Sequence, residues 1–362
     1  MTQIAILTRT FDGVVGGVEK MVLSLAKGLT DEGHKVTVIS LDSLESNAFF
    51  EWPMEVDWEK LNIGNADLKA GFKVRIRRVM AIRKIFKMRS IDVVVGFQIG
   101  SFALARFSAA GLDIHCIAAE RNSPTLFKFI RFGKLKRIIS QIILCSASKV
   151  TVQFENYKKL YPKIIQHRIL VTPNPVKSVS SSANLIRHGM QDATNIRLLY
   201  VGRFSYQKNI ECLIRAFSLL PDTFQLTLLG PGSIQFICSY SDLKAFTRIH
   251  AKEENMNLQE VYLGHDIFCL SSRFEGFPNV VGEALAHGMP VVGFAGCSGL
   301  PELITAGING EIASGNNDHQ TLSEAILRAS KKVYDSKIIS ESISKYTFEN
   351  FVNSWISAIE FK

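Results

Sequence analysis

The sequence predicts an α/β protein with two Rossmann-like domains, each a doubly wound parallel sheet, that face each other across a cleft. Three observations predict this fold. Short apolar segments alternate with segments of helical periodicity, as expected for parallel strands buried on both faces. The alternation stops at residues 172–195, where Pro, Ser and Asn accumulate, and it restarts afterwards. The length of 362 residues also favours two domains over one.

The first domain is predicted to comprise residues 1–176 and to begin with a strand, a glycine loop and a helix. The helix is expected from EKMVLSLAKGLTDEG, in which apolar residues recur at helical spacing. Ligands of such sheets bind beyond the carboxyl ends of the strands, so the loops there are the first candidates for a site. The segments expected to be buried strands are residues 4–10, 35–40, 92–97, 115–120 and 149–153.

The second domain is predicted to comprise residues 196–345, after a linker at residues 177–195. Helices are expected at residues 209–220 and around 241–257, and a terminal helix within residues 346–362 is expected to pack back towards the first domain. The segments expected to be strands are residues 197–202, 225–230, 261–264, 266–272 and 290–295.

Two of these strands stand in conflict with the rules of parallel sheets. Only His265 separates the segments VYLG and DIFCLSS, whereas parallel neighbours need a crossover of about a dozen residues or more. We therefore expect this chain to have lost a helix, to have rearranged its strands or to lack a segment at this point.

Composition and targeting signals predict a cytoplasmic protein. The six cysteines are scattered without a C-x-x-C pair, so they are expected to be reduced core residues and neither disulfides nor zinc ligands. The N-terminal MTQIAILTRTF has the pattern of a first strand and not of a secretion signal. The most apolar window, residues 138–147, is too short and too polar to span a bilayer.

Much of the formal net charge of +9 is concentrated at residues 69–89 and 128–137, where Lys and Arg mix with Phe, Ile, Met and Val. Either segment alone is compatible with a solvated helix face whose apolar side packs inward. Two such segments in one half of the chain favour peripheral contact with an anionic membrane surface, at its inner face. Nucleic acid is not expected as a partner, because no DNA- or RNA-binding motif accompanies the charge.

Two loops carry residues that suit a phosphorylated ligand. DGVVGGVEK places Gly16 and Gly17 before a helix, where backbone can approach an anion, although such turns are common without a ligand. VGRFSYQKN places Arg203 and Lys208 between a strand and a helix, as expected for a diphosphate site or for two solvated cations. No Walker sequence accompanies them.

A third stretch, RFEGFPNVVGEALAHGMPVV, places Glu275 in a loop and Glu283 in the first turns of a helix. Pro278 suits the start of that helix, and the exposed amides there favour an anion. A carboxylate at Glu283 can accept hydrogen bonds from ribose hydroxyls, and one at Glu275 can contact a sugar hydroxyl or a developing positive charge. Two glutamates that merely favour a helix start would not explain the Gly-Phe-Pro-Asn between them.

Together these segments resemble family 4 of the retaining GT-B glycosyltransferases (glycosyl transferases group 1). EGFPNVVGE matches the E-x7-E motif of that family, and the other matching segments follow the family's order over nearly the whole chain. The resemblance implies the GT-B fold, an acceptor held by the first domain, and a nucleotide sugar, expected to be a UDP-sugar, held by the second. The other matching segments are GGVEKMVLSLAKGLTDEGHKVTVIS, AERNSP, TPNPV, VGRFSYQKN, EALAHGMPVV and PELI.

The resemblance also implies roles for single residues. Arg203 and Lys208 would bind the diphosphate and stabilise the leaving group, and Glu275 would contact the donor sugar at its reacting face. Glu120 and Arg121 are expected on the acceptor side, and Arg121 stands where many relatives have a histidine. Similar enzymes need no divalent metal or other cofactor, and no metal-binding D-x-D motif is present. The residues implied to bind the donor are Gly16, Gly17, Gly276, Phe277, Pro278, Asn279, Val280 and Glu283.

The predicted function is a metal-independent retaining hexosyltransferase that moves a sugar from a UDP-sugar to a lipid-linked glycan or to a lipopolysaccharide or polysaccharide precursor. The short connection at His265 favours an alternative, a catalytically inactive homologue that binds nucleotide sugars or acts as a scaffold in envelope-glycan assembly. A third hypothesis is an enzyme with a soluble acceptor such as a sugar phosphate, which would be active without lipid.

Overall fold

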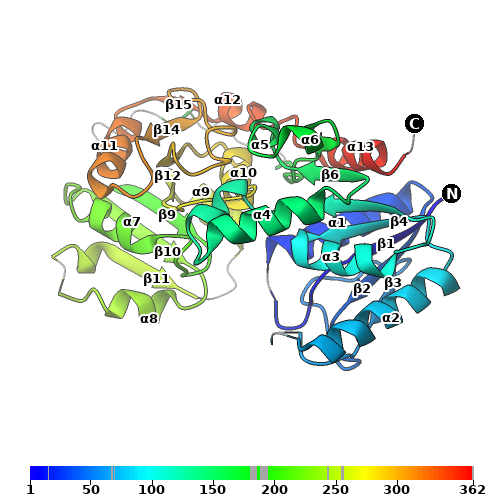
Figure 1. The fold of residues 1–362 in the computed structure, drawn as a ribbon. Coiled ribbons are helices and arrows are strands. Elements are labelled where there is room, and N and C mark those ends of the chain that lie inside the picture. Colours follow the sequence, from blue (N-terminus) through cyan, green and yellow to red (C-terminus); the bar gives the residue numbers. More distant parts are fainter. Residues whose placement is uncertain are drawn as a thin grey trace. The chain divides into compact units, whose positions relative to one another are not determined.

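The computed structural model describes residues 1–14, 16–66, 68, 70–179, 186–187, 195–242, 244–253 and 257–360. The chain divides into two compact units, drawn as ribbons in Figure 1. The first contains residues 1–174 and 349–362, and the second contains residues 175–348. Most of the predicted linker, residues 177–195, lies outside the described residues.

The first unit is built on a parallel sheet with the strand order β3-β2-β1-β4-β5-β6-β7. Its central strand β1 pairs Ile6 with Val38 on one side and with Val95 on the other. The order reverses between β1 and β4, so the carboxyl ends of these strands form the switch point at which such sheets bind ligands. The strands are β1 Gln3–Leu7, β2 Lys35–Ser40, β3 Asp57–Lys60, β4 Val93–Phe97, β5 His115–Ala119, β6 Lys149–Val152 and β7 Ile169–Val171.

Helices cover this sheet, and the last helix of the chain belongs to the first unit. Trp355 of this helix is fully buried and stacks on Phe97 at the end of β4, with 5.9 Å between the ring centres. In Figure 1 the helix, α13, is drawn in red beside the strands of the first unit. The helices are α1 Gly17–Asp31, α2 Phe72–Met88, α3 Gln98–Ser108, the 3₁₀ helix Pro124–Lys128, α4 Gly133–Leu144, α5 Glu155–Lys158, α6 Lys163–Gln166 and α13 Phe348–Ile359.

The second unit repeats the architecture with the parallel strand order β11-β10-β9-β12-β13-β14. Its switch point lies between β9 and β12. The strands are β9 Ile196–Val201, β10 Phe224–Leu229, β11 Ile249–Lys252, β12 Ile267–Leu270, β13 Val291–Phe294 and β14 Gly310–Ala313. The helices are α7 Ile210–Phe217, α8 Ser233–Cys238, the 3₁₀ helix Phe246–Arg248, α9 Leu258–Leu263, α10 Asn279–Ala286, α11 His319–Ser330 and α12 Ser336–Glu341.

A two-stranded antiparallel ribbon also belongs to the second unit. β8 Ile186–Arg187, within the predicted linker, pairs with β15 Tyr334–Asp335.

The structure overturns the prediction that residues 261–264 form a strand. VYL lies in helix α9, whose inner side buries Val261 and Tyr262. The prediction of a helix around residues 241–257 is also wrong, because the strand β11 lies within this range. The helix α9 then connects β11 to β12 and supplies the crossover that parallel strands require. A short apolar run has the same pattern in a buried strand and in a short helix, which explains the error. The chain therefore does not join two parallel strands through His265 alone, because His265 lies between α9 and β12.

The cysteine prediction is correct for four of the six thiols. All six are free, and Cys116, Cys212, Cys269 and Cys297 are buried, but Cys145 and Cys238 are exposed.

Candidate functional site

Two loops of the second unit meet beyond the carboxyl ends of β9 and β12. Residues 202–209 follow β9, and residues 271–278 follow β12. The Ser271 hydroxyl donates a hydrogen bond to the carbonyl oxygen of Lys208 (2.9 Å), and the Asn209 side-chain amide donates to the carbonyl oxygen of Ser271 (3.2 Å). Asn209 adopts the left-handed conformation (φ 55°), which Asn tolerates better than most residues. These bonds hold the two loops together.

Lys208 and Glu275, which are far apart in the sequence, form an ion pair between these loops. The Lys208 Nζ lies 2.8 Å from Glu275 Oε1, and the side chains are only 15% and 7% exposed. The Gln207 side-chain amide donates to Glu275 Oε2 at 3.2 Å. The ammonium has three N–H donors, so Lys208 can hold Glu275 and still donate to a bound anion.

Arg203 lies at the entrance to the same loop and is exposed. Its guanidinium has no hydrogen-bond or ion-pair partner among the residues that the structure describes. Its carbonyl oxygen accepts a hydrogen bond from the Tyr200 hydroxyl (3.0 Å). Burial raises the pKa of Tyr200, as does the negative charge of Glu275, so the phenol stays neutral and remains a donor. The backbone beside Arg203 is thereby fixed while its side chain remains available.

Glu283 lies in α10 and is held by a residue of α9. The Tyr262 hydroxyl donates to Glu283 Oε2 at 3.0 Å, and the Tyr262 ring stacks on His287 with 4.8 Å between ring centres. Burial and the charge of Glu283 raise the pKa of Tyr262, which keeps the hydroxyl protonated. One carboxylate oxygen of Glu283 is thus fixed by the helix that the sequence interpretation had missed.

The remaining predicted donor-binding residues form the loop after Glu275 and the first turn of α10. Phe277 packs edge-on against Tyr346, with 5.4 Å between ring centres, so its side chain contributes to the core of the unit. Gly276, Phe277 and Pro278 are buried, whereas Asn279 and Val280 are partly exposed at the start of α10.

This arrangement suits a ligand that combines negative charge with hydroxyl groups. Arg203 and Lys208 supply cationic donors, and the first amides of α10 add the positive end of a helix dipole. Glu275 and Glu283 supply carboxylate acceptors for hydroxyl groups. Cations positioned in advance stabilise a departing diphosphate without reorganisation of the site.

In the first unit, Glu120 lines a cavity beyond the ends of β4 and β5. The cavity has a volume of about 370 Å³ and is also lined by Asn122, Ser123 and Lys136. Burial raises the pKa of Glu120 to about 7, and the neighbouring charge of Arg121 opposes that rise. Glu120 can therefore bind or release a proton near neutral pH.

Arg121 lines the same cavity, but its guanidinium is buried in the protein. It donates to Thr151 Oγ1, and to the carbonyl oxygen and Oγ1 of Thr172 at 2.7 and 2.6 Å. It also lies 5.1 Å from the centre of the Trp355 ring. Burial lowers the pKa of Arg121 to about 9. These contacts tie β6, the end of β7 and α13 together, so Arg121 positions the structure around Glu120.

Gly16 and Gly17 lie in the first unit, at the start of α1. A Cβ atom on Gly16 would fall 2.3 Å from Oε2 of Glu19, a contact far too short for real atoms. The carboxylate of Glu19 thus lies beside the N-terminal turn of α1, where an anion was expected. A phosphate at this turn would be repelled by the negative charge of Glu19 unless that side chain moved away.

Tyr262 and Gln207 are the site residues that the sequence interpretation missed. A signal for the helix that carries Tyr262 was present in the N-x-x-E pattern of Asn257 and Glu260, which lie five and two residues before Tyr262. This pattern is typical of a helix start. In the structure Asn257 accepts from the Gln259 amide (3.2 Å) and donates to Glu260 (3.0 Å). No comparable pattern marks Gln207, because its partner Glu275 is distant in the sequence.

Among the residues that the structure describes, no group of three or more His, Cys, Asp or Glu side chains is placed to hold a metal ion. No described helix is both long enough and apolar enough to cross a membrane.

Comparisons with known proteins agree with this architecture. The family model "Glycosyltransferase Family 4" matches residues 15–178, and "Glycosyl transferases group 1" matches residues 185–346. A Campylobacter jejuni relative is 22% identical over 79% of this chain and 77% of its own length. It is named GalNAc-alpha-(1->4)-GalNAc-alpha-(1->3)-diNAcBac-PP-undecaprenol alpha-1,4-N-acetyl-D-galactosaminyltransferase.

Solved structures share the fold across the whole chain. The apo form of the lipopolysaccharide outer core galactosyltransferase WaaB has a TM-score of 0.78 at 18% identity and covers 99% of both chains. Anabaena Alr3699/HepE, solved in complex with UDP-glucose, has a TM-score of 0.74 at 15% identity and also covers 99% of both chains. With both family models matched in order and two parallel-sheet α/β units present, the protein belongs to the family 4-type GT-B glycosyltransferases.

Proposed function

We propose that the protein is a retaining glycosyltransferase that moves a sugar from a UDP-sugar to a lipid-linked glycan or to a lipopolysaccharide or polysaccharide precursor. The observation that carries this proposal is the Lys208–Glu275 pair with the exposed Arg203 beside it. These groups combine two cations for a departing diphosphate with a carboxylate for the sugar, and Glu283 lies on the adjacent helix.

The proposed chemistry breaks the bond between the sugar's anomeric carbon and the diphosphate oxygen. Arg203, Lys208 and the first amides of α10 stabilise the charge that develops on the diphosphate. The acceptor oxygen forms the new bond on the face from which the diphosphate leaves, and its proton passes to the leaving group. Glu275 supports the positive charge that develops on the sugar, and Glu283 accepts from the ribose hydroxyls. In this proposal no metal ion takes part.

Two similarities support the choice of substrates. The Campylobacter jejuni relative is named for a diphospho-undecaprenol-linked acceptor, and Anabaena HepE was solved with UDP-glucose. The hypothesis of an inactive homologue rested on the conflict at His265, which the helix α9 removes. The helix that was expected to be missing beside the proposed nucleotide site is therefore present, and its Tyr262 contacts Glu283.

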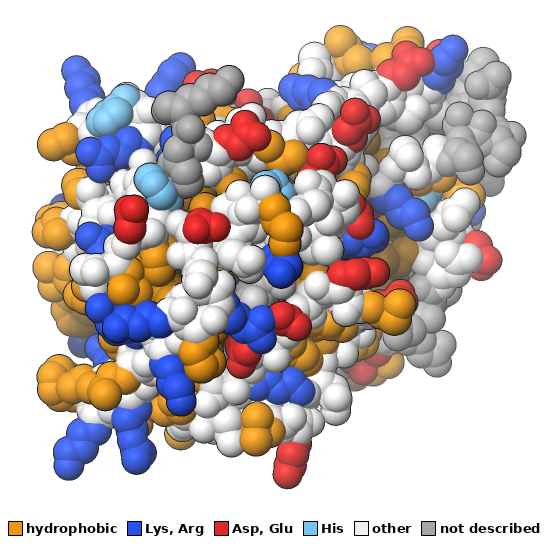
Figure 2. All heavy atoms as spheres, turned by 90° about the vertical axis from the view of Figure 1, so that its right-hand side faces the viewer, with side chains coloured by type: hydrophobic (Ala, Val, Ile, Leu, Met, Phe, Trp, Pro, Cys, Tyr) orange, Lys and Arg blue, Asp and Glu red, His pale blue; other side chains and the backbone are white. Residues whose placement is uncertain are grey.

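The acceptor is proposed to be reached at an anionic membrane surface. Helix α4 exposes Leu135, Ile138 and Ile142 among Lys134 and Arg137. Figure 2 shows Lys and Arg side chains interspersed with hydrophobic ones along the left edge of its view. Such a surface binds anionic lipid through both its charge and its apolar area, which supports a peripheral location at the inner face of the membrane.

The test of the donor site is a thermal-shift titration with UDP, and with GDP and ADP as controls. A ligand at a hundred times its Kd stabilises the folded protein by about 2.7 kcal/mol, which raises the melting temperature measurably. We expect a shift that is selective for UDP. A protein that melts cooperatively but responds to none of the nucleotides would contradict the proposed donor and favour the inactive homologue. Transfer to a water-soluble acceptor without any lipid would contradict the proposed acceptor class.

A further inference from the structure

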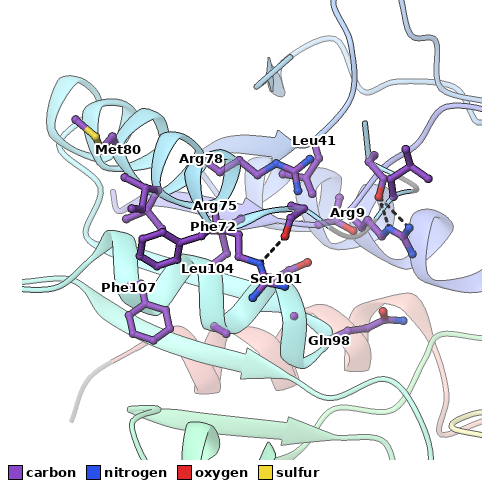
Figure 3. Close-up of a pocket in the computed structure, with 18 residues that line it drawn as sticks. Arg9, Leu41, Phe72, Arg75, Arg78, Met80, Gln98, Ser101, Leu104 and Phe107 are labelled. Carbon is purple, nitrogen blue, oxygen red and sulfur yellow. Dashed lines mark hydrogen bonds between the residues drawn. The ribbon is translucent and has the colours of Figure 1, made fainter. Parts of the chain in front are cut away.

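A side chain that donates to a backbone carbonyl oxygen can hold a short segment of chain in place. Dashed lines in Figure 3 mark two examples in the first unit, where Arg9 donates to the carbonyl oxygen of Ala66 (2.8 Å) and Arg75 donates to that of Ala70 (3.0 Å). His265 makes the corresponding contact in the second unit, at the end of α9. The proposed chemistry gives this histidine no role.

The helix α9 needs such support, because it has only six residues and buries two of them, Val261 and Tyr262. Helices this short are not stable by themselves in water, so contacts with the rest of the unit determine where α9 lies. Asn257 caps its first turn by accepting from the Gln259 amide at 3.2 Å. The last turn of any helix has carbonyl groups that need donors from outside the helix.

His265 supplies one of these donors and connects the end of α9 to β10. Its Nδ1 lies 2.7 Å from the carbonyl oxygen of Val261, and its Nε2 lies 2.9 Å from Thr227 Oγ1. A carbonyl oxygen can only accept, so Nδ1 carries the proton, and Nε2 of the neutral ring accepts from the Thr227 hydroxyl. Burial lowers the pKa of His265 and outweighs the hydrogen bond to Val261, which raises it, so the ring is neutral near pH 7.

The carbonyl group that His265 holds belongs to the residue directly before Tyr262. The Tyr262 hydroxyl donates to Glu283 Oε2 at 3.0 Å, and it lies at the far end of a long side chain. A small rotation of α9 would therefore move this hydroxyl by a larger distance, and hydrogen bonds weaken steeply as their geometry worsens. A continuous set of contacts runs from β10 to the carboxylate through Thr227, His265, Val261, Tyr262 and Glu283.

We propose that His265 is a positioning residue for the nucleotide. Together with Thr227 it fixes α9, so that Tyr262 holds Glu283 in the orientation that the ribose hydroxyls require. His265 touches neither the nucleotide nor the reacting atoms, and it acts only through the ribose contact. This inference rests on the proposed function, in which Glu283 accepts from the ribose hydroxyls.

The alternative is that His265 only stabilises the fold of the second unit. A purely structural role predicts a lower melting temperature and an equal effect on every nucleotide that the site binds. The positioning role predicts an effect that depends on the ribose hydroxyls. A comparison of UDP with 2′,3′-dideoxyuridine diphosphate, which lacks both hydroxyls, separates the two roles.

The test measures the dissociation constants of UDP and of this analogue by titration calorimetry. We expect the wild-type protein to bind UDP about tenfold or more tightly, because the analogue loses hydrogen bonds to a carboxylate. Thr227→Val keeps the β-branched shape of the side chain but removes its hydroxyl. It should reduce the ratio of the two constants about threefold or more, mainly by weakening UDP, because the imidazole loses a hydrogen bond. Thr227→Ser keeps the hydroxyl and should keep the wild-type ratio.

His265→Ala should reduce the ratio further, because both hydrogen bonds of the imidazole are lost. Tyr262→Phe, which removes the hydroxyl at Glu283, gives the ratio expected when the last contact of the set is cut. His250→Ala is the matched control and should keep the wild-type ratio, because His250 is exposed on the neighbouring strand β11. Equal weakening of UDP and the analogue in Thr227→Val and His265→Ala would overturn the proposal in favour of a structural role.

Hydrogen exchange tests the effect on α9 without any nucleotide. The amides of residues 258–263 should exchange faster in Thr227→Val than in Thr227→Ser, because α9 opens more often when its contact with β10 is lost. Equal exchange in these two variants would refute the positioning role even if His265→Ala failed to fold.

The wild-type measurements separate this inference from the proposed function. Equal affinity for UDP and the analogue would refute the ribose contact of Glu283, and the inference with it, while the proposed donor would stand. A wild-type protein that bound neither nucleotide would contradict the proposed donor, and with it the ribose role on which the inference rests.

Discussion

Lys208 and Glu275 stabilise each other before any substrate binds. Their side chains are 15% and 7% exposed. The loss of one partner would therefore leave a largely buried charge without compensation, which typically costs about 3–5 kcal/mol. The pair thus contributes both to the fold of the second unit and to the proposed chemistry, and a variant must be tested for both effects.

We predict that Lys208→Ala lowers kcat by roughly a hundredfold or more, because one cation for the leaving group is lost. The same change should lower the free energy of unfolding by about 3–5 kcal/mol, because it leaves Glu275 buried without its partner. Glu275→Gln should lower kcat comparably with a smaller loss of stability, because its amide oxygen can still accept a hydrogen bond from Lys208. Steady-state kinetics and urea denaturation of the same preparations measure the two effects.

Arg215→Ala is the control for this prediction. Arg215 forms an exposed ion pair with Glu211 in the same unit, at 2.7 Å, and exposed pairs contribute about 0–1 kcal/mol. If Lys208→Ala were as active as Arg215→Ala, Lys208 would have no part in catalysis.

The sequence predicts the identity of these residues better than their contacts. Glu275 and Glu283 follow from a motif in one short stretch, and Arg203 and Lys208 follow from another. The ion pair between Lys208 and Glu275 joins residues that lie 67 positions apart. Such a contact depends on where β9 and β12 end in the sheet, and no local pattern of residue types encodes it.

Short helices and edge strands are the elements that the sequence predicts least well. The long, strongly periodic α1 and the apolar strands β1, β2, β4 and β5 lie close to their expected positions. β3, with the sequence DWEK, was missed because an edge strand that is half exposed has no apolar run. α9 was mistaken for a strand because its two buried residues, Val261 and Tyr262, are adjacent and show no helical period.

Helix α4 carries the prediction of membrane contact. Its residues Ile138 and Ile142 are 54% and 66% exposed and one helical turn apart. Because burial of a whole aliphatic side chain contributes about 1.5–3 kcal/mol, the double change Ile138→Ser and Ile142→Ser should weaken binding to vesicles of anionic lipid by about tenfold or more. Co-sedimentation with such vesicles at low salt measures this effect.

The matched control for α4 is Ile308→Ser. Ile308 is 50% exposed, close to the 54% of Ile138, and lies in the second unit. Ile308→Ser therefore removes one comparably exposed apolar side chain from a place outside α4. If the α4 double variant sedimented with vesicles as well as the Ile308 variant does, α4 would not contact the membrane. A wild-type protein that ignored anionic vesicles at low salt would contradict peripheral membrane contact as a whole.

The chain leaves its first unit at residue 174 and returns to it at residue 349. The returning helix α13 contributes Trp355, which is fully buried, stacks on Phe97 and lies against Arg121. The core of the first unit therefore combines residues before position 175 with residues after position 348, which the whole second unit separates in the sequence.

We predict that Trp355→Ala lowers the unfolding free energy of the first unit by about 3–5 kcal/mol, the usual cost of removing a buried aromatic side chain. The chain has three tryptophans, and the other two, Trp52 and Trp58, stack on each other in the same unit. Their fluorescence during urea denaturation therefore reports on the first unit alone.

Trp355→Phe should lose much less stability, because a phenyl ring can still stack on Phe97. The UDP-induced thermal shift should persist, since residues 203–283 are in the second unit. Equal unfolding free energies for the Ala and Phe variants would show that α13 is not part of the cooperative core.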